Sequence, residues 1–106
     1  MRIHHVQVSC PPGGEDAARR FYGDGLGIPE VAKPPVLAAR GGCWFRDEGV
    51  EIHVGVEDGF VPARKAHPAF VVDDLDGTAV RLEALGFVEG SNSQPGQYVI
   101  ERAFVG

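Results

Sequence analysis

The sequence predicts an α+β protein built from two similar halves, each with one helix and several short strands. Strand-like and helix-like stretches alternate, and a single helix in each half favours a mixed sheet over a doubly wound one. The halves also form a weak internal repeat: His5 or His67 opens the first strand, and a Leu-Gly pair ends the helix. The repeat suggests two βαβββ modules, about 1–56 and 67–106, joined by a polar connector at 57–66.

Five segments of the first half carry patterns of regular structure. Alternation of apolar and polar residues indicates strands, and the acids Glu15 and Asp16 suit the positive end of a helix dipole. In chain order we expect a strand at 3–9, a helix from Glu15 to the glycines at 23, 25 and 27, a loop with at most a short edge strand between Pro29 and Pro34, a strand or hairpin arm at 37–39 and 42–45, and a strand at 50–56.

The second half shows the same signals in a shorter chain. Its helix carries apolar residues spaced for a core face and ends at a glycine. These core-face residues are Leu75, Val80, Leu82 and Leu85. In chain order we expect a strand-like run at 67–72, a helix at 74–85, and short strands at 87–88 and 98–100.

Composition and charge exclude several classes of protein. The 106 residues have an ordinary globular composition and fit one domain. A net charge of −5 disfavours nucleic acid and anionic membranes as partners, because both repel an acidic surface. No apolar run approaches the roughly 20 residues of a membrane helix, and no signal-peptide pattern opens the chain, so we expect a cytoplasmic protein. Cys10 and Cys43 form neither a disulfide scaffold nor a CxxC motif.

Five polar side chains are placed for chemistry on strand faces. His5 shares a face with Gln7, Glu51 shares one with His53, and His67 takes the place in the second half that His5 has in the first. Imidazole and carboxylate ligands that converge from strands suit Fe, Zn, Ni, Co or Mn. Each residue also has a plainer interpretation. A lone histidine is most commonly a surface or half-buried residue, and the Glu51–His53 pair fits a solvated sheet face equally well.

Other catalytic motifs find no support in the sequence. No GxSxG or HExxH pattern occurs, and the glycines at 23–27 follow a helix rather than a strand, which indicates a helix end instead of a phosphate loop. Cys43 is best interpreted as a small buried hydrophobe. Trp44 and Tyr98 are more commonly core or interface residues, although an aromatic-lined cup would need such side chains.

Several segments together resemble the vicinal oxygen chelate superfamily, which includes glyoxalase I, extradiol dioxygenases, fosfomycin-resistance enzymes and bleomycin-resistance proteins. The resemblance covers roughly residues 3–88 and rests on the order and spacing of its motifs. The matching segments are Ile-His-His-Val-Gln-Val at 3–8, Ala-Arg-Arg-Phe-Tyr at 18–22, Leu-Gly at 26–27, Gly-Cys-Trp-Phe at 42–45, Val-Glu-Ile-His-Val at 50–54 and His-Pro-Ala-Phe-Val-Val-Asp-Asp-Leu at 67–75.

The resemblance implies that two βαβββ modules form a cupped mixed sheet around a metal site. By position, His5 and His67 are the first-strand ligands of the two modules, and Glu51 is the last-strand carboxylate of the first. A divalent ion, Fe, Zn, Ni, Co or Mn, would bind vicinal oxygens of a substrate and stabilise a developing enolate or oxyanion. The residues that we expect to contact the substrate are Gln7, Trp44, His53 and Tyr98.

The chain departs from the family pattern near its C-terminus. Family members usually end the second module on a strand whose Glu completes the site, whereas 98–106 matches only the strand before it. Glu101 would replace that Glu only in a different register. The second module is therefore expected to lack its final strand, and because an unpaired edge invites pairing, we expect a homodimer.

Two functions fit these observations, and a third is kept open. The first is a metal-dependent lyase, isomerase or dioxygenase of the glyoxalase type, which the three ligand-type residues favour. The second is a metal-free protein that binds a small molecule such as an antibiotic, as bleomycin-resistance proteins do. The missing Glu favours this second function, and the acidic charge would suit a cationic ligand. The third is a relative that keeps only the fold.

Overall fold

The computed structural model describes residues 1–87 and the backbone of 98–99. Its centre is a four-stranded sheet in the order β1-β4-β3-β2. β1 runs parallel to β4, whereas β4 with β3 and β3 with β2 are antiparallel. The mixed sheet of an α+β protein is therefore confirmed. The strands are β1 (Val6–Cys10), β2 (Glu30–Val31), β3 (Cys43–Asp47) and β4 (Val50–Val56).

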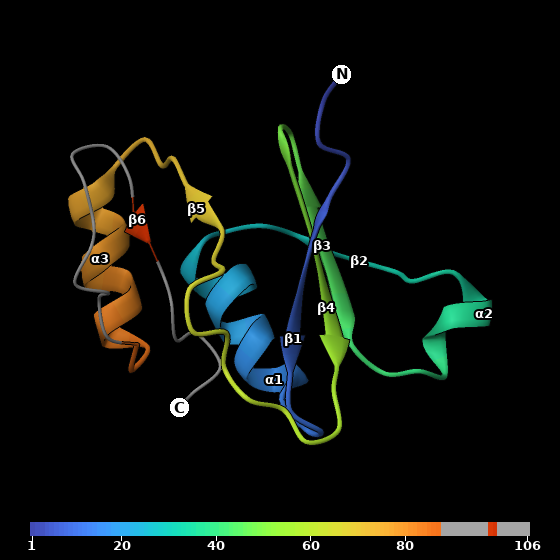
Figure 1. The fold of residues 1–106 in the computed structure, drawn as a ribbon. Coiled ribbons are helices and arrows are strands. Elements are labelled where there is room, and N and C mark those ends of the chain that lie inside the picture. Colours follow the sequence, from blue (N-terminus) through green and yellow to red (C-terminus); the bar gives the residue numbers. More distant parts are fainter. Residues whose placement is uncertain (88–97, 100–106) are drawn as a thin grey trace.

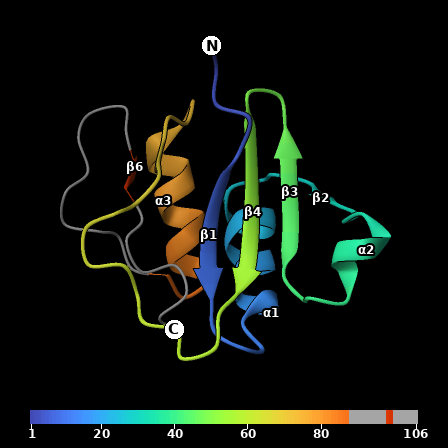
Figure 2. The same cartoon turned by 45° about the vertical axis from the view of Figure 1, so that its right-hand side comes forward.

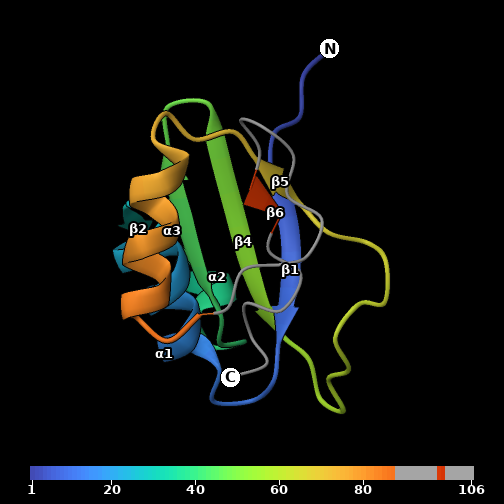
Figure 3. The same ribbon diagram turned by 90° about the vertical axis from the view of Figure 1, so that its left-hand side faces the viewer.

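Two helical segments cover one face of this sheet (Figures 1 and 3). The α-helix α1 (Glu15–Ala18) continues directly into the π-helical segment η1 (Arg19–Gly25), and α3 (Leu75–Ala84) packs against η1. The short helix α2 (Pro35–Ala38) lies on the other side of the sheet in Figure 1. Figure 2 shows β1, β4 and β3 in front of α1 and α3.

The core lies between the sheet and these helices. Ile52 of β4, Phe45 of β3, Phe21 of η1 and Leu82 of α3 are each at most 1% exposed and belong to one apolar cluster. Gly25 lets η1 and α3 approach closely, because a Cβ there would lie 2.5 Å from the Leu82 side chain. Removal of this apolar surface from water is the main term that holds the helices to the sheet.

α3 confirms the helix predicted at 74–85. Asp74 caps it, since its carboxylate accepts a hydrogen bond of 3.0 Å from a backbone N–H of the first turn. Leu82 is buried as expected, but the expectation for Val80 is wrong, because its side chain is 67% exposed. Thr78 and Leu82 lie four residues apart and form the buried stripe, so Val80 between them points away from it.

Two boundaries in the first half differ from expectation. β1 begins at Val6 instead of residue 3, because its ladder with β4 starts at the pair Val6–Ile52. The segment 37–39, expected in a strand or hairpin arm, belongs largely to α2. Pro34 is extended with ψ 141°, and Pro35 takes the first helical turn, where its missing N–H has no intrahelical partner to lose.

The other elements of the first half follow the sequence. The segment between the two prolines, expected as a loop with at most a short edge strand, contains the two-residue strand β2, and the strand predicted at 50–56 is β4. Both cysteines are buried and free, and burial raises the pKa of the Cys43 thiol to about 11. This thiol is therefore protonated at neutral pH, and Cys43 is the small buried hydrophobe that the sequence predicts.

The first strand of the second half is shorter than expected. The run at 67–72 contributes two strand residues, β5 (Ala69–Phe70), which pair antiparallel with β6 (Tyr98–Val99) in a separate sheet. Val88 and Ile100, expected in short strands, lie outside the described residues. The second βαβββ module and its missing final strand therefore stay predictions. None of the helices in the described part of the chain has the length and apolarity that crossing a membrane requires.

Candidate functional site

The candidate site lies on the sheet face turned away from α1 and α3. The register places Gln7 of β1, His53 of β4 and Trp44 of β3 side by side in one row. Side chains alternate along a strand, so His53 projects opposite to Ile52 and Val54, which enter the core. The pairing of three strands therefore brings together residues that are far apart in the sequence.

Three rings stack across this face. The His53 ring lies between the His5 ring, at a centroid distance of 3.9 Å, and the Trp44 ring, at 3.8 Å. The interplanar angles are 16° and 2°, so the rings are nearly parallel. His53 is only 6% exposed as a result. Contact on both faces fixes the plane of the His53 ring and hence the direction of its nitrogens.

His53 in turn orients Glu51. Nε2 of His53 lies 2.7 Å from Oε2 of Glu51, and because a carboxylate only accepts hydrogen bonds, Nε2 is the donor. This hydrogen bond is the main cause that lowers the pKa of Glu51 below its ordinary value of 4.5, with smaller contributions from charges that include Arg46, 3.9 Å away. The site therefore holds an ionised and oriented carboxylate at neutral pH.

Two further imidazoles lie next to this carboxylate. His4, His5 and Glu51 each offer one ligand atom, and the three atoms lie within 4.8 Å of one another. Ligand atoms bound to one zinc-sized ion at about 2.0–2.2 Å lie within roughly 4 Å of each other. Small side-chain adjustments would therefore let the three residues bind one ion, and their donor set of two nitrogens and one oxygen suits a divalent transition metal.

A hollow of about 200 Å³ opens beside the ring stack. Its lining includes Trp44 and Gln7 from the sheet and Lys33, Leu37 and Arg40 from the segment around α2. The Gln7 side chain lies close to Gly55, which is possible because Gly55 has no side chain. A Cβ at Gly55 would lie 2.8 Å from the Gln7 amide nitrogen.

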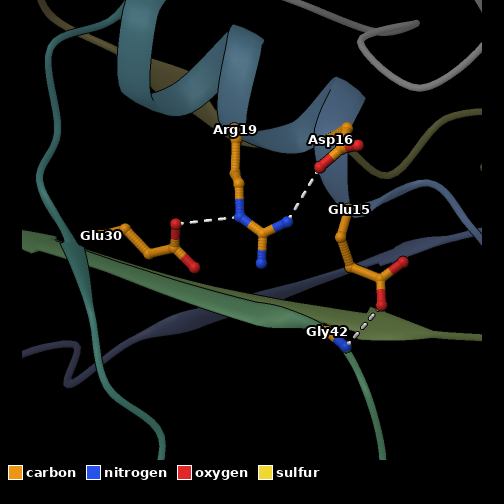
Figure 4. A network of polar contacts seen from close by, with 5 residues as sticks. All are labelled: Glu15, Asp16, Arg19, Glu30 and Gly42. Atoms are coloured by element: carbon orange, nitrogen blue, oxygen red, sulfur yellow. Dashed lines mark hydrogen bonds and ion pairs between the residues drawn. The ribbon is translucent and has the colours of Figure 1, made fainter.

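A polar network ties α1 and η1 to the strands below them (Figure 4). Arg19 donates to Glu30 at 2.9 Å and to Asp16 at 3.0 Å, and these hydrogen bonds, Glu30 first, raise the pKa of Arg19. Glu15 accepts a hydrogen bond of 3.2 Å from the Gly42 backbone nitrogen. The hydrogen bond between Glu15 and Gly42 holds the turn from which β3 starts, and thereby helps to position Trp44.

The structure brings together most of the residues proposed from the sequence. His5, Glu51, His53 and Trp44 are joined by the contacts above, and Gln7 lies in the same row. The remaining predicted residues are His67, Tyr98 and Glu101. His67 is exposed ahead of β5, and its Nδ1 lies 2.6 Å from the Lys65 carbonyl oxygen, so it is not part of the His4–His5–Glu51 group. Tyr98 lies in β6, but its side chain and Glu101 are outside the described residues.

Sequence reasoning missed three residues near the site. A strand at 3–9 would point His4 away from His5, and only the later start of β1 lets both imidazoles lie beside Glu51. The His-His pair at the start of the chain was the available signal. Lys33 and Arg40 carried no such signal, because α2 and the turn after it bring them to the hollow.

The mixed sheet with helices on one face is the α+β arrangement of a glyoxalase-like fold. A solved crystal structure of a "putative glyoxalase family protein" from Bacillus anthracis matches it with a TM-score of 0.81 and 42% sequence identity. The match covers 98% of this chain and 88% of that one, so this chain belongs to the glyoxalase family. Comparisons with family models and with curated proteins give no match.

Proposed function

We propose that this protein is a metal-dependent enzyme that acts on a small oxygenated substrate. The observation that carries the proposal is that His4, His5 and Glu51 each offer a ligand atom within 4.8 Å of the other two. Fe, Zn, Ni, Co and Mn all accept such a ligand set, and two imidazoles with one carboxylate leave coordination positions free for substrate.

The residues of the site have separable roles in this proposal. A bound divalent ion would supply Lewis-acid polarisation of vicinal substrate oxygens. His4 and His5 would bind it as neutral imidazoles and Glu51 as a carboxylate. His53 holds Glu51 in place through its Nε2 hydrogen bond, and Trp44 holds the His53 ring. His53 and Trp44 are therefore positioning residues, which support a ligand without binding the ion.

A homodimer forms the second part of the proposal. The family resemblance implies that His67 is a ligand, yet within the described part of one chain it stands outside the His4–His5–Glu51 group. A second copy would be able to bring its own His67 to the site. It would also cover the edge of β1, which pairs only with β4 among the described strands.

Metal content of protein purified without a histidine tag tests the proposal. After incubation with Fe, Ni, Zn or Mn, we expect nearly one ion per chain in the wild type and strong loss in His5→Ala and Glu51→Gln. Comparison of His4→Ala with His67→Ala identifies the third ligand: loss in His4→Ala alone assigns it within one chain, and loss in His67→Ala assigns it to the second copy. A wild-type protein that retains no metal under any of these conditions contradicts the proposal.

A metal-free binding protein is the second candidate, because the hollow beside Trp44 offers about 200 Å³ of space that a small molecule would fill without an ion. Ligand binding that is unchanged in His5→Ala and Glu51→Gln, in a protein without metal, would favour this function.

A further inference from the structure

The hollow beside Trp44 carries two positive charges without a carboxylate partner. The Lys33 ammonium group donates a hydrogen bond to the Gly41 carbonyl oxygen, and the Arg40 side chain is exposed. Neither forms an ion pair with any residue that the structure describes. Glu15, which reaches the same turn, already accepts a hydrogen bond from the Gly42 backbone nitrogen. In a chain of net charge −5, Lys33 and Arg40 therefore make a local positive pair in the lining of the hollow.

The walls of the hollow are mixed in character. Leu37 and the Trp44 indole offer apolar surface, and Gln7 offers an amide that can both donate and accept. Small-molecule sites combine apolar walls with a few placed polar groups in this way. Lysine and arginine are the side chains that bind carboxylates most strongly. An inorganic anion would leave the apolar wall uncovered, whereas an organic acid would use both parts.

We propose that this hollow binds the carboxylate of a small organic acid, and that substrates of the site therefore carry a carboxylate. The link to the site is direct: Trp44 lines the hollow and stacks on His53, which holds Glu51. The inference deepens the proposed function. Its statement about substrates rests on that function, whereas its statement about the hollow does not. The overall acidic charge would suit a cationic ligand. The hollow disfavours such a ligand, because the charges that line it are positive.

Trp44 is the sole tryptophan of the chain and lines the hollow, so its fluorescence and its indole N–H resonance report on binding there when the protein is kept free of metal. The experiment titrates metal-free protein with benzoate and with benzamide, which match in shape and differ in charge. We expect a saturable change with benzoate and at least roughly tenfold weaker binding of benzamide, since hydrogen bonds to a charged group are stronger than those to a neutral one. Equal responses, or an equal response to inorganic phosphate, would overturn the proposal.

Two double variants separate a local site from overall charge. Lys33→Met/Arg40→Gln removes the cations of the hollow, and Arg64→Gln/Lys65→Met removes two exposed cations of the connector with the same change in net charge. We expect benzoate preference to be lost in the first and kept in the second; equal loss in both would reject the hollow as its cause. Arg40→Gln alone, at an exposed side chain, gives the same test if the first variant does not fold.

Metal content of these variants keeps the two proposals apart. The hollow variants leave His4, His5 and Glu51 intact, so we expect their metal content to equal that of the wild type. Benzoate preference in a wild-type protein that takes up no metal on incubation would support the hollow and reject the metal site. Bound metal without benzoate preference would do the reverse.

Discussion

His53 is the residue on which the geometry of the candidate site depends most. It is buried between two rings and gives its Nε2 hydrogen bond to Glu51. Groups that orient metal ligands typically change metal affinity 10–100-fold when they are replaced. A side chain that never touches the ion is therefore expected to control how well the ion binds.

The variant His53→Phe tests this role, because it keeps a ring in the stack and removes the hydrogen bond. We expect metal affinity to fall roughly 10–100-fold, measured by titration calorimetry, and the pKa of Glu51 to rise, measured by carboxyl NMR. Trp44→Phe is the control, since it keeps both a stacking ring and the Glu51 hydrogen bond. An unchanged Glu51 pKa in His53→Phe would show that the hydrogen bond does not orient Glu51.

Acid should weaken the fold partly through Glu51. Folding lowers the pKa of Glu51, chiefly through the His53 hydrogen bond. The ionised carboxylate therefore stabilises the fold above its ordinary pKa of 4.5, and this contribution is lost as the pH falls through the lowered folded-state pKa. We expect urea unfolding of Glu51→Gln to depend less on pH in this acidic range than that of the wild type. Glu48→Gln, at an exposed position after β3, should retain the wild-type dependence.

Among the elements, β3 depends on the turn before it. Gly41 and Gly42 both have positive φ, 73° and 83°, and a Cβ at Gly42 would collide with the Val54 carbonyl oxygen of β4. This turn places Trp44 beside His53, and Glu15 of α1 secures it. The position of the ring stack therefore depends on backbone geometry at Gly41 and Gly42, just before Trp44 in the chain.

Gly42→Ala should destabilise the protein by about 2 kcal/mol or more, because strain at positive φ adds to the collision. Gly49→Ala is the matched control: its φ is 79°, yet a Cβ there meets nothing within 4 Å. We expect Gly49→Ala to cost about 1 kcal/mol, the conformational part alone. Urea unfolding measures both, and equal losses would contradict the role assigned to the close approach of β3 and β4.

At the scale of the whole molecule, a homodimer is the testable prediction. Light scattering at micromolar concentration should give about twice the chain mass of 11.3 kDa, and a mass near 11.3 kDa would contradict the dimer. If the edge of β1 forms the interface, Ile3→Asp should shift the mass toward that of one chain, because Ile3 is 81% exposed just ahead of β1. Val36→Asp, at an 84% exposed residue of α2, should not.

Local patterns in the sequence were sufficient for most of the elements. A helix at 74–85 follows from its aspartate cap and terminal glycine, and the strand at 50–56 follows from two-residue alternation, because both signals arise from neighbouring residues. Val80 and 37–39 show where such patterns fail. Apolar character does not say which face of a helix meets the core, and a leucine-alanine run after two prolines fits a helical turn as well as a strand.

Residue types and alternation likewise sufficed to place Glu51 and His53 on one polar face and to propose His5 as a ligand. Which side chains lie next to these residues depends on pairing between strands distant in sequence, which no local pattern encodes. The parallel register of β1 with β4 starts the strand at Val6 and frees His4 to join His5, and the turn at Gly41 carries Arg40 to the hollow. Contacts that form only when the sheet assembles therefore set the ligand group and the charge of the hollow.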